Sequence, residues 1–240
     1  MSRLLENLAH VRQRIADAAR RSGRSPEDVT LLAVTKYVGD DMIADLVAAG
    51  CLDLGESRPQ ALWAKALVLG QRTGQQNASA AKVRWHLVGH LQRNKIAQTL
   101  PLVSRIHSID SLRLLKAIHD AAANQGRRVD ALIEVNVSGD AAKHGFAPTD
   151  VVPALATFTA FDHVHVCGLM CMAAREGDLA IARQNFAALR ALRDRLAADK
   201  PDNVSLDDLS MGMSGDYEIA IEEGATIVRI GSALFEGVGR

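Results

Sequence analysis

The hydrophobic residues of this chain follow two alternating patterns: short apolar runs, and longer segments with helical spacing. Several of the runs are continuous and rich in β-branched residues, which is typical of parallel strands buried on both faces. The runs that we expect to be strands span residues 30–36, 51–56, 84–90, 104–110, 131–138, 163–170, 205–212 and 226–232. Eight strands alternating with helices predict an α/β fold of the (β/α)8 TIM-barrel type. An open doubly wound sheet is the weaker alternative, because no G-x-G-x-x-G motif follows the first run.

Segments with apolar residues at three- and four-residue intervals lie between the runs and before the first of them. We expect helices over residues 40–49, 111–124 and 178–199, each with an apolar stripe that packs on the barrel. An extra N-terminal helix is predicted over residues 3–21, where it covers the bottom or the flank of the barrel. Residues 70–82 are polar and small, which predicts a flexible loop or a frayed helix end.

Composition narrows the classes of protein to which the chain can belong. We expect a single domain over residues 1–240, because no linker or internal repeat divides the chain. Aromatic residues make up only 4% of the chain, so Leu, Val, Ile and Ala must fill the core. The 28 basic and 28 acidic side chains balance, which gives no electrostatic reason to expect nucleic acid or a membrane surface as a partner.

The three cysteines, Cys51, Cys167 and Cys171, have no paired spacing typical of zinc or redox sites. We interpret Cys51 and Cys167 as buried free thiols of a reducing cytoplasm, and expect Cys171, near a strand end, to be more exposed. The amphipathic start of the chain is not a signal peptide, and no apolar run reaches membrane-spanning length. A cytoplasmic location is therefore predicted.

Reactive side chains in a barrel of this kind gather at the carboxyl ends of the strands. The first run ends in Lys36. Desolvation at such a position disfavours the charged form of an amine and makes it a better nucleophile, one able to form a Schiff base with an aldehyde. Taken alone, the first run favours the simpler interpretation, a lysine whose amine reaches solvent.

Two glycine-serine turns follow the last two runs. Ser214 and Gly215 precede a short helix that we expect to start at Asp216, and Gly231 and Ser232 open a second helix. Free backbone N–H groups at such turns bind anions, and phosphate sites of barrels commonly lie after strands seven and eight. Either turn alone is typical of an ordinary helix cap. Together with the strand-end lysine, they predict a phosphorylated aldehyde as cofactor.

Arg229 lies two residues before Gly231, so both residues should share one face of the last strand. We expect the arginine to point into the barrel, beneath the ring of a cofactor whose phosphate is bound at the turns. The alternative for a buried arginine is a structural ion pair. Candidate carboxylates for that pair are Asp53, Glu56 and Glu134.

Eight sequence blocks in this order resemble the pyridoxal 5′-phosphate homeostasis protein family. The blocks are AVTK (33–36), LGES (54–57), WHLVGHLQRNK (85–95), SIDS (108–111), EVNVSGDAAKHG (134–145), GLM (168–170), LSMGMSGD (209–216) and VRIGSALF (228–235). The resemblance covers nearly the whole chain, and the family looks like the N-terminal barrel of alanine racemase, fold type III. Ser57 departs from the family pattern, which usually has asparagine there.

The resemblance implies a role for several residues. Lys36 matches the lysine that carries pyridoxal 5′-phosphate (PLP) as an internal aldimine, and Arg229 matches the arginine facing the pyridine nitrogen. The positions matching the phosphate cradle are Ser214, Gly215, Gly231 and Ser232. His86 and Asn136 match family positions near the pocket. The resemblance implies no metal and no catalytic residue.

Two functions from different classes fit this cofactor. The resemblance implies a carrier without robust catalysis that takes part in intracellular PLP homeostasis and passes PLP to apoenzymes. We expect a monomer, because nothing in the sequence demands a second chain to complete the site. The alternative is a PLP-dependent amino acid racemase of the alanine racemase type, which needs a second base on the far face of the substrate. Alanine racemases take that base from a tyrosine in a second domain. Here we expect Tyr37 to face away from Lys36 and Tyr217 to be a packing residue.

A third interpretation keeps the barrel and the phosphate site but has no aldimine. The ligand would then be a phosphorylated sugar or amino-acid intermediate, and Lys36 would pair with an anion. The joint occurrence of the eight blocks disfavours this interpretation.

Overall fold

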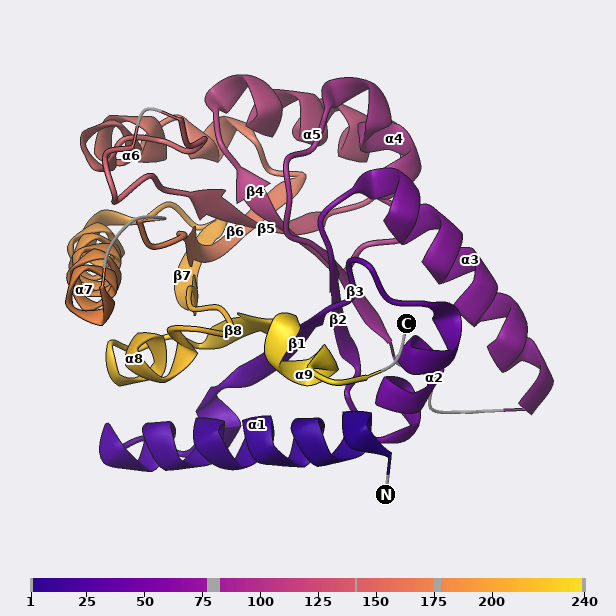
Figure 1. The fold of residues 1–240 in the computed structure, drawn as a ribbon. Coiled ribbons are helices and arrows are strands. Elements are labelled where there is room, and N and C mark those ends of the chain that lie inside the picture. Colours follow the sequence, from indigo (N-terminus) through magenta and orange to yellow (C-terminus); the bar gives the residue numbers. More distant parts are fainter. Residues whose placement is uncertain (1, 77–82, 141, 175–177, 239–240) are drawn as a thin grey trace.

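Eight parallel strands form a closed barrel in which neighbours in sequence are also neighbours in space (Figure 1). The computed structural model describes residues 2–76, 83–140, 142–174 and 178–238. The strands are β1 (Thr30–Val34), β2 (Asp53–Glu56), β3 (Arg84–Leu87), β4 (Arg105–Ile109), β5 (Val129–Glu134), β6 (Val164–Met170), β7 (Val204–Ser210) and β8 (Ile227–Ile230). The predicted TIM barrel is confirmed, as is the place of each strand in it.

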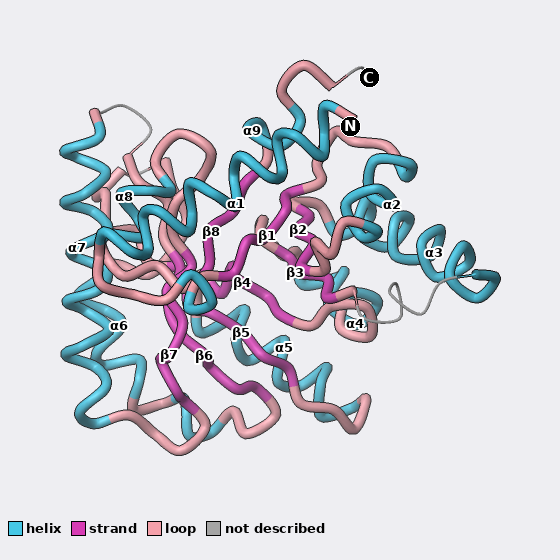
Figure 2. Tube along the Cα trace, turned by 90° about the horizontal axis from the view of Figure 1, so that it is seen from below, coloured by secondary structure: helices cyan, strands magenta, loops and turns pink. Residues whose placement is uncertain are grey.

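Helices surround the strands, with α6 and α7 on one side and α2 and α3 on the other in Figure 2. The helices are α1 (Arg3–Arg21), α2 (Asp40–Ala48), α3 (Pro59–Gln76), α4 (Ile96–Thr99), α5 (Leu112–Asn124), α6 (Pro148–Leu155), α7 (Leu179–Leu196), α8 (Tyr217–Glu222) and α9 (Ser232–Phe235). Short 3₁₀ turns lie at Pro26–Asp28, Arg93–Lys95, Phe158–Ala160 and Ala197–Asp199. No helix in the described part of the chain is long and apolar enough to cross a membrane.

The extra helix α1 lies along the flank of the barrel, beside α8 and α9 (Figure 1). Its apolar stripe, which includes Leu4, Leu8 and Val11, is buried, as the helical spacing predicted. The Asn7 side chain fastens it to the end of the chain by donating to the carbonyls of Leu234 at 3.0 Å and Glu236 at 2.8 Å.

Several predicted strands are longer than the observed ones at their carboxyl ends. The run 30–36 ends at Val34, the run 84–90 at Leu87 and the run 131–138 at Glu134. Ladder pairing stops at these points, and the residues beyond them form loops at the mouth of the barrel. Helix α3 extends through the first half of the polar segment 70–82, and residues 77–82 lie outside the described part.

Two layers of apolar side chains make up the core. A large cluster fills the space between strands and helices, and a small one inside the barrel contains Leu32, Leu132, Cys167, Met170 and Ile227. The remaining interior is polar, because charged and histidine side chains also point inward.

All three cysteines are buried and free. The prediction is therefore confirmed for Cys51 and Cys167, but the greater exposure expected for Cys171 is wrong. Cys171 has no solvent exposure, because Arg229 packs against it and donates to its carbonyl oxygen at 2.8 Å.

Candidate functional site

The candidate site is a cavity of about 530 Å³ at the carboxyl ends of the strands. Loops that follow different strands meet there, because parallel strands end at one rim. Six of the residues predicted for the site line this cavity: Lys36, Ser214, Gly215, Arg229, Gly231 and Ser232. The structure thus brings together the amine, the two glycine-serine turns and the arginine.

Lys36 lies two residues beyond the end of β1, at the mouth of the barrel. The preceding Thr35 is buried and anchors the chain by donating from its backbone N–H to the carbonyl of Gly55 at 2.8 Å. The Lys36 side chain itself is exposed and makes no hydrogen bond or ion pair with the described residues. The prediction that Lys36 is desolvated is therefore wrong, because the strand ends at Val34, before it reaches Lys36.

We expected Tyr37 to lie on the opposite face of a continuing strand from Lys36, and that prediction is wrong. Tyr37 has a φ of 72°, and its ring, 77% exposed, lies 5.7 Å from Lys36 Nζ. The alternation of faces does not apply, because the chain has already left the strand. Tyr217, in contrast, is a packing residue as predicted, buried beneath α1 with Arg14 over its ring.

A second lysine near the site shows why Lys36 is the available amine. Lys65 Nζ, on α3, lies 2.7 Å from a carboxylate oxygen of Glu56 and donates to the carbonyl of Thr35 at 2.7 Å. These two acceptors hold the Lys65 amine away from the cavity lining. Lys36 has no such partner in the described structure and can offer its amine to a ligand.

The two glycine-serine turns interlock through one hydroxyl. Ser214 Oγ accepts hydrogen bonds from the backbone N–H groups of Gly231 at 3.3 Å and Ala233 at 3.2 Å. An acceptor oxygen thus lies where the first N–H groups of α9 point, which is the position that an anion's oxygen takes at a helix start. A Cβ atom added to Gly215 would meet nothing within 4 Å, so this turn leaves open space for a ligand.

The turn after β7 depends on one further glycine. Gly212 has a φ of +90°, and a Cβ atom there would lie 2.5 Å from the Cβ of Ala220. Helix α8 can approach the turn this closely only because the side chain is missing. Asp216 caps the turn by accepting from the backbone N–H of Met213 at 2.6 Å, and α8 begins directly after it, as predicted.

Arg229 points into the barrel, as its place on the last strand predicted, and is only 5% exposed. It donates to the carbonyl of Ser210 at 2.7 Å, to the Ser210 hydroxyl at 2.8 Å and to the carbonyl of Cys171. No carboxylate among the described residues forms an ion pair with it, so the structural ion pair is not observed. Burial lowers the pKa of the Arg229 guanidinium below its ordinary value.

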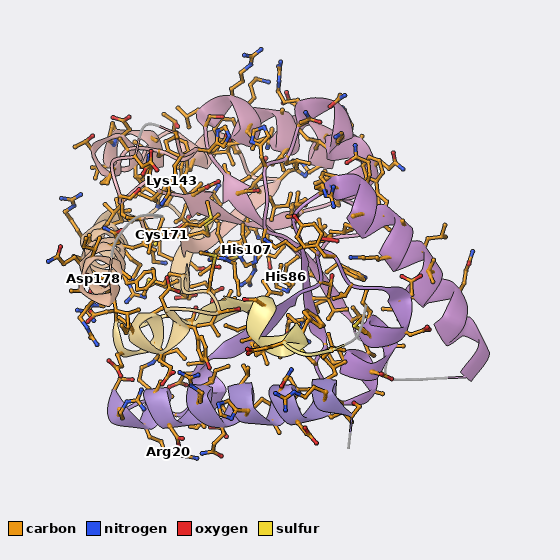
Figure 3. All side chains as sticks on the ribbon, viewed as in Figure 1. Arg20, His86, His107, Lys143, Cys171 and Asp178 are labelled. Atoms are coloured by element: carbon orange, nitrogen blue, oxygen red, sulfur yellow. The ribbon has the colours of Figure 1, made fainter. Side chains whose placement is uncertain are left out.

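A chain of hydrogen bonds crosses the barrel interior from Arg229 to Asp53. Ser210 Oγ lies 2.9 Å from His107 Nδ1, His107 Nε2 lies 2.9 Å from His86 Nδ1, and His86 Nε2 lies 3.2 Å from an Asp53 oxygen. Figure 3 shows His86 and His107 inside the ring of strands. Burial lowers the pKa of both histidines, most strongly that of His107, so both rings are neutral.

The donor and the acceptor of each hydrogen bond in this series follow from the residues at its two ends, Arg229 and Asp53. An arginine only donates, so the Ser210 oxygen accepts from Arg229 and its own hydrogen is free for His107 Nδ1. Burial acts to raise the pKa of Asp53, but hydrogen bonds from His86 and Arg84 outweigh it and lower that pKa to about 2. The Asp53 carboxylate therefore accepts from His86 Nε2. One tautomer of each histidine satisfies both ends, with Nε2 protonated.

Comparison with known proteins places the chain in a family. The alanine racemase N-terminal domain family matches residues 6–237. The pyridoxal phosphate homeostasis protein of Aquifex aeolicus is 37% identical over 230 residues, 96% of either chain. That of Pseudomonas aeruginosa is 37% identical over 236 residues, 98% of this chain and 96% of the other. The chain belongs to the pyridoxal phosphate homeostasis protein family.

Solved structures agree with this membership. PipY of Synechococcus elongatus PCC7942 is 32% identical, and the match covers 92% of this chain and 99% of PipY. The TM-score is 0.81 for PipY without PLP and 0.79 for PipY with PLP bound. An alanine racemase of Clostridium difficile 630 matches 97% of this chain and 56% of its own, with a TM-score of 0.70 at 15% identity. That likeness shows a shared barrel fold.

Two site residues expected from the family resemblance lie away from the cavity lining. His86 is buried in the barrel interior, where it takes part in the hydrogen-bond chain below Arg229. Asn136 lies in the loop after β5, where its side chain donates to the carbonyl of Asp140 at 2.8 Å. Contact of either residue with a ligand in this family member stays a prediction.

Four polar residues that our prediction of the site omitted also line the cavity: Ser57, His90, Glu134 and His144. Burial, and then the charge of the nearby Asp110, raise the pKa of the Glu134 carboxyl above its ordinary range. The sequence did carry a signal for Ser57 and His90, because they directly follow or end predicted strands, whereas Glu134 lies inside the predicted strand 131–138 and ends only the observed one. We weighed Glu134 only as a partner for Arg229, and the loop that returns His144 to the rim left no pattern in the sequence.

Proposed function

We propose that this protein binds PLP in the cavity at the mouth of its barrel and takes part in PLP homeostasis. The observation that carries the proposal is the meeting of an unpaired amine, Lys36, with two glycine-serine turns in one cavity of about 530 Å³. A phosphorylated aldehyde requires these two kinds of group at a fixed separation. PLP homeostasis in relatives of 37% identity supports the same ligand.

The lining residues fit PLP group by group. When bound, PLP supplies an aldehyde that condenses with a primary amine and releases water. Lys36 provides that amine. The turns at Ser214 and at Gly231 and Ser232 would bind the phosphate, whose oxygen would take over the Gly231 N–H that Ser214 Oγ now accepts, and the open space at Gly215 would accommodate it. Arg229, a buried cation that lines the cavity, would hold the ring-nitrogen side of PLP and offers it donors but no proton acceptor.

We infer a carrier without robust catalysis, in the cytoplasm, that acts as a monomer and passes PLP to apoenzymes. The homeostasis names of its relatives support this role over that of a racemase. Arg229 supports it as well. A ring nitrogen beside a guanidinium would stay unprotonated, so the cofactor would withdraw electrons less strongly than one paired with a carboxylate. The PLP-bound relative PipY shares the fold and supports the choice of cofactor.

The absorbance spectrum of the purified protein tests the cofactor proposal. The protein as purified, or after incubation with PLP, should show a yellow absorbance band that borohydride bleaches. Peptide mass mapping should then find the pyridoxyl group on the peptide that contains Lys36. A protein that stays colourless in excess PLP, or one labelled on Lys65 in place of Lys36, would overturn the proposal.

An amino acid racemisation assay tests the absence of catalysis. Among the described lining residues, Glu134, His90 and His144 are the candidate bases apart from Lys36, so Glu134→Gln is the informative variant. We expect the unmodified protein to racemise alanine at a rate far below that of alanine racemase measured alongside. Turnover that matches alanine racemase and disappears in Glu134→Gln would replace the carrier proposal with the racemase alternative.

A further inference from the structure

Three metal-ligating side chains meet at the rim of the barrel, beside the cavity. They are His90, Asp110 and His144, and their candidate ligand atoms all lie within 4.8 Å of one another. They follow β3, β4 and β5, three neighbouring strands, so the barrel itself places them at one point of the rim. His90 and His144 also line the cavity, on its open side.

The geometry of the three side chains is close to that of a metal centre. His90 Nδ1 lies 3.0 Å from an oxygen of Asp110, and the rings of His90 and His144 stack with centroids 4.9 Å apart. Ligands of a tetrahedral zinc ion lie about 3.4 Å from one another, given metal–ligand bonds of about 2.1 Å. Both imidazoles are exposed at the rim, so small rotations of their rings bring the nitrogens to that separation.

Supporting contacts hold the acidic member of the group in place. Ser111 donates from its hydroxyl to the other oxygen of Asp110 at 2.9 Å, and Ser111 is the N-cap of α5. Metal-binding carboxylates are commonly oriented by such second hydrogen bonds. No lysine or arginine in the described structure pairs with Asp110, whose side-chain partners there are His90 and Ser111.

The loop that carries His144 is closed at its base. Phe146 donates to the carbonyl of Glu134 at 2.8 Å, and Asn136 donates to the carbonyl of Phe146 at 2.9 Å. Gly145 makes this closure possible, because it has a φ of +111° and a Cβ atom there would lie 3.0 Å from the backbone of Asn136. Lys143 fastens the loop further by donating to the carbonyl of Ala173 at 2.6 Å. The loop thus returns His144 to the rim.

We propose that His90, Asp110 and His144 bind a divalent transition-metal ion at the rim of the cavity. Two imidazoles and one carboxylate suit zinc and the metals near it in ligand preference. Three protein ligands leave at least one coordination position open, and the ion binds with that position toward the cavity that His90 and His144 line. A small molecule in the cavity with a carboxylate or amine can occupy it.

A second group at the opposite end of the barrel serves as the comparison. Asp130, His165 and Cys167 also lie within ligand distance of one another. There, however, His165 Nδ1 lies near both the Asp130 oxygen, at 3.1 Å, and Cys167 Sγ, at 3.4 Å. Burial raises the pKa of the Cys167 thiol to about 12, and Arg105 lies 4.0 Å from Asp130. A nearby cation and a protonated thiol both oppose metal binding.

Calorimetric titration of the untagged protein with zinc alone tests the proposal, after chelator treatment and at matched PLP content. We expect one zinc per chain, with affinity reduced at least tenfold in His90→Gln, Asp110→Asn and His144→Gln. His10→Gln changes an exposed histidine on α1 and should leave the affinity unchanged. The two rim histidines are exposed and Asp110 is partly buried, and circular dichroism checks that each variant is folded.

Two further variants exclude other zinc sites. His165→Gln and Lys36→Ala should both retain full zinc affinity, because neither touches the proposed ligands. Loss of zinc in His165→Gln assigns the metal to the opposite end of the barrel and overturns the proposal. Loss in Lys36→Ala assigns it to bound PLP and overturns it equally, whereas the PLP proposal itself is judged by borohydride labelling. Zinc binding that is absent, or unchanged in all three rim variants, also overturns it.

Discussion

Histidines occur both at the rim and in the interior of this barrel, but they have different surroundings in the two places. At the rim, Lys36, His90 and His144 are exposed and have few partners, and they surround a cavity. In the interior, His86 and His107 are buried, and every polar atom of their rings is paired. Unpaired groups at a cavity are available to a ligand, whereas paired buried groups hold strands together. Changes at the rim should therefore alter binding, and changes in the interior should alter stability.

Lys36→Ala should separate the effect on PLP binding from the effect on stability most clearly. Loss of the amine should abolish borohydride-stable labelling with PLP completely. The free energy of unfolding should stay within about 0.5 kcal/mol of the original, because the side chain is exposed and unpaired. Urea denaturation and mass mapping measure the two effects, with Lys116→Ala, another exposed lysine, as the control. An unfolded Lys36→Ala protein would place Lys36 with the interior residues and break the comparison.

Acidification should destabilise the protein through the interior histidines. Burial lowers the folded-state pKa of His86 and His107 below the value near 6.5 of the unfolded chain. Above that pH both states are neutral, and below it only the unfolded state takes up protons, so stability is lost as pH falls. Between pH 7.5 and 5.5 each histidine can remove up to roughly 1.4 kcal/mol, or roughly 2.7 kcal/mol for the pair.

The variant His107→Gln isolates this effect. Glutamine does not titrate, so the variant should be less stable at pH 7.5 but should lose less stability on acidification. The raised pKa of Glu134 acts in the opposite direction, because the folded state then takes up a proton, but that effect is common to both proteins. Asp53, with a pKa of about 2, contributes only at lower pH. Equal pH slopes in urea denaturation would show that His107 is not buried and neutral.

Ser210→Ala should destabilise the interior by about 2 kcal/mol, because His107 Nδ1 loses its donor and stays buried. Arg229 keeps its hydrogen bonds to the carbonyl oxygens of residue 210 and of Cys171, so PLP labelling at Lys36 should persist. Ser104→Ala, at an exposed serine, is the control for urea denaturation. A loss below about 0.5 kcal/mol would mean that the hydrogen-bond chain adds little to stability.

Gly215→Ala should give the smallest effect, a weakening of PLP binding by about tenfold, equivalent to about 1.4 kcal/mol. The added methyl group meets no protein atom, so the folded protein accepts it without loss of stability. It does enter the open space proposed for the phosphate. Gly70→Ala, a helical glycine away from the cavity, is the control. Unchanged PLP affinity in Gly215→Ala would move the phosphate site elsewhere.

Much of the fold could be predicted because its signals are local. Apolar runs located all eight strands, and the helical spacing located α1, α5 and α7 closely. Strand ends were harder to predict, because pairing stops where a neighbouring strand stops. The first strand was predicted to run to residue 36 but ends at Val34, and the predicted burial of Lys36 was wrong for that reason. Turn residues such as Gly231 and Ser232 were predictable because their conformation is demanded by the turn itself.

The sequence by itself determined the barrel, the paired turns and the strand-end lysine, because hydrophobic period and turn chemistry depend on residues close in the chain. Only the tertiary structure decided which distant groups meet. Register and barrel closure set Asp53 beside His86 and His107 beside Ser210, and a loop closure brought His144 to His90. These contacts join different strands and loops, and no local pattern encodes the distance between groups that only a closed barrel brings together.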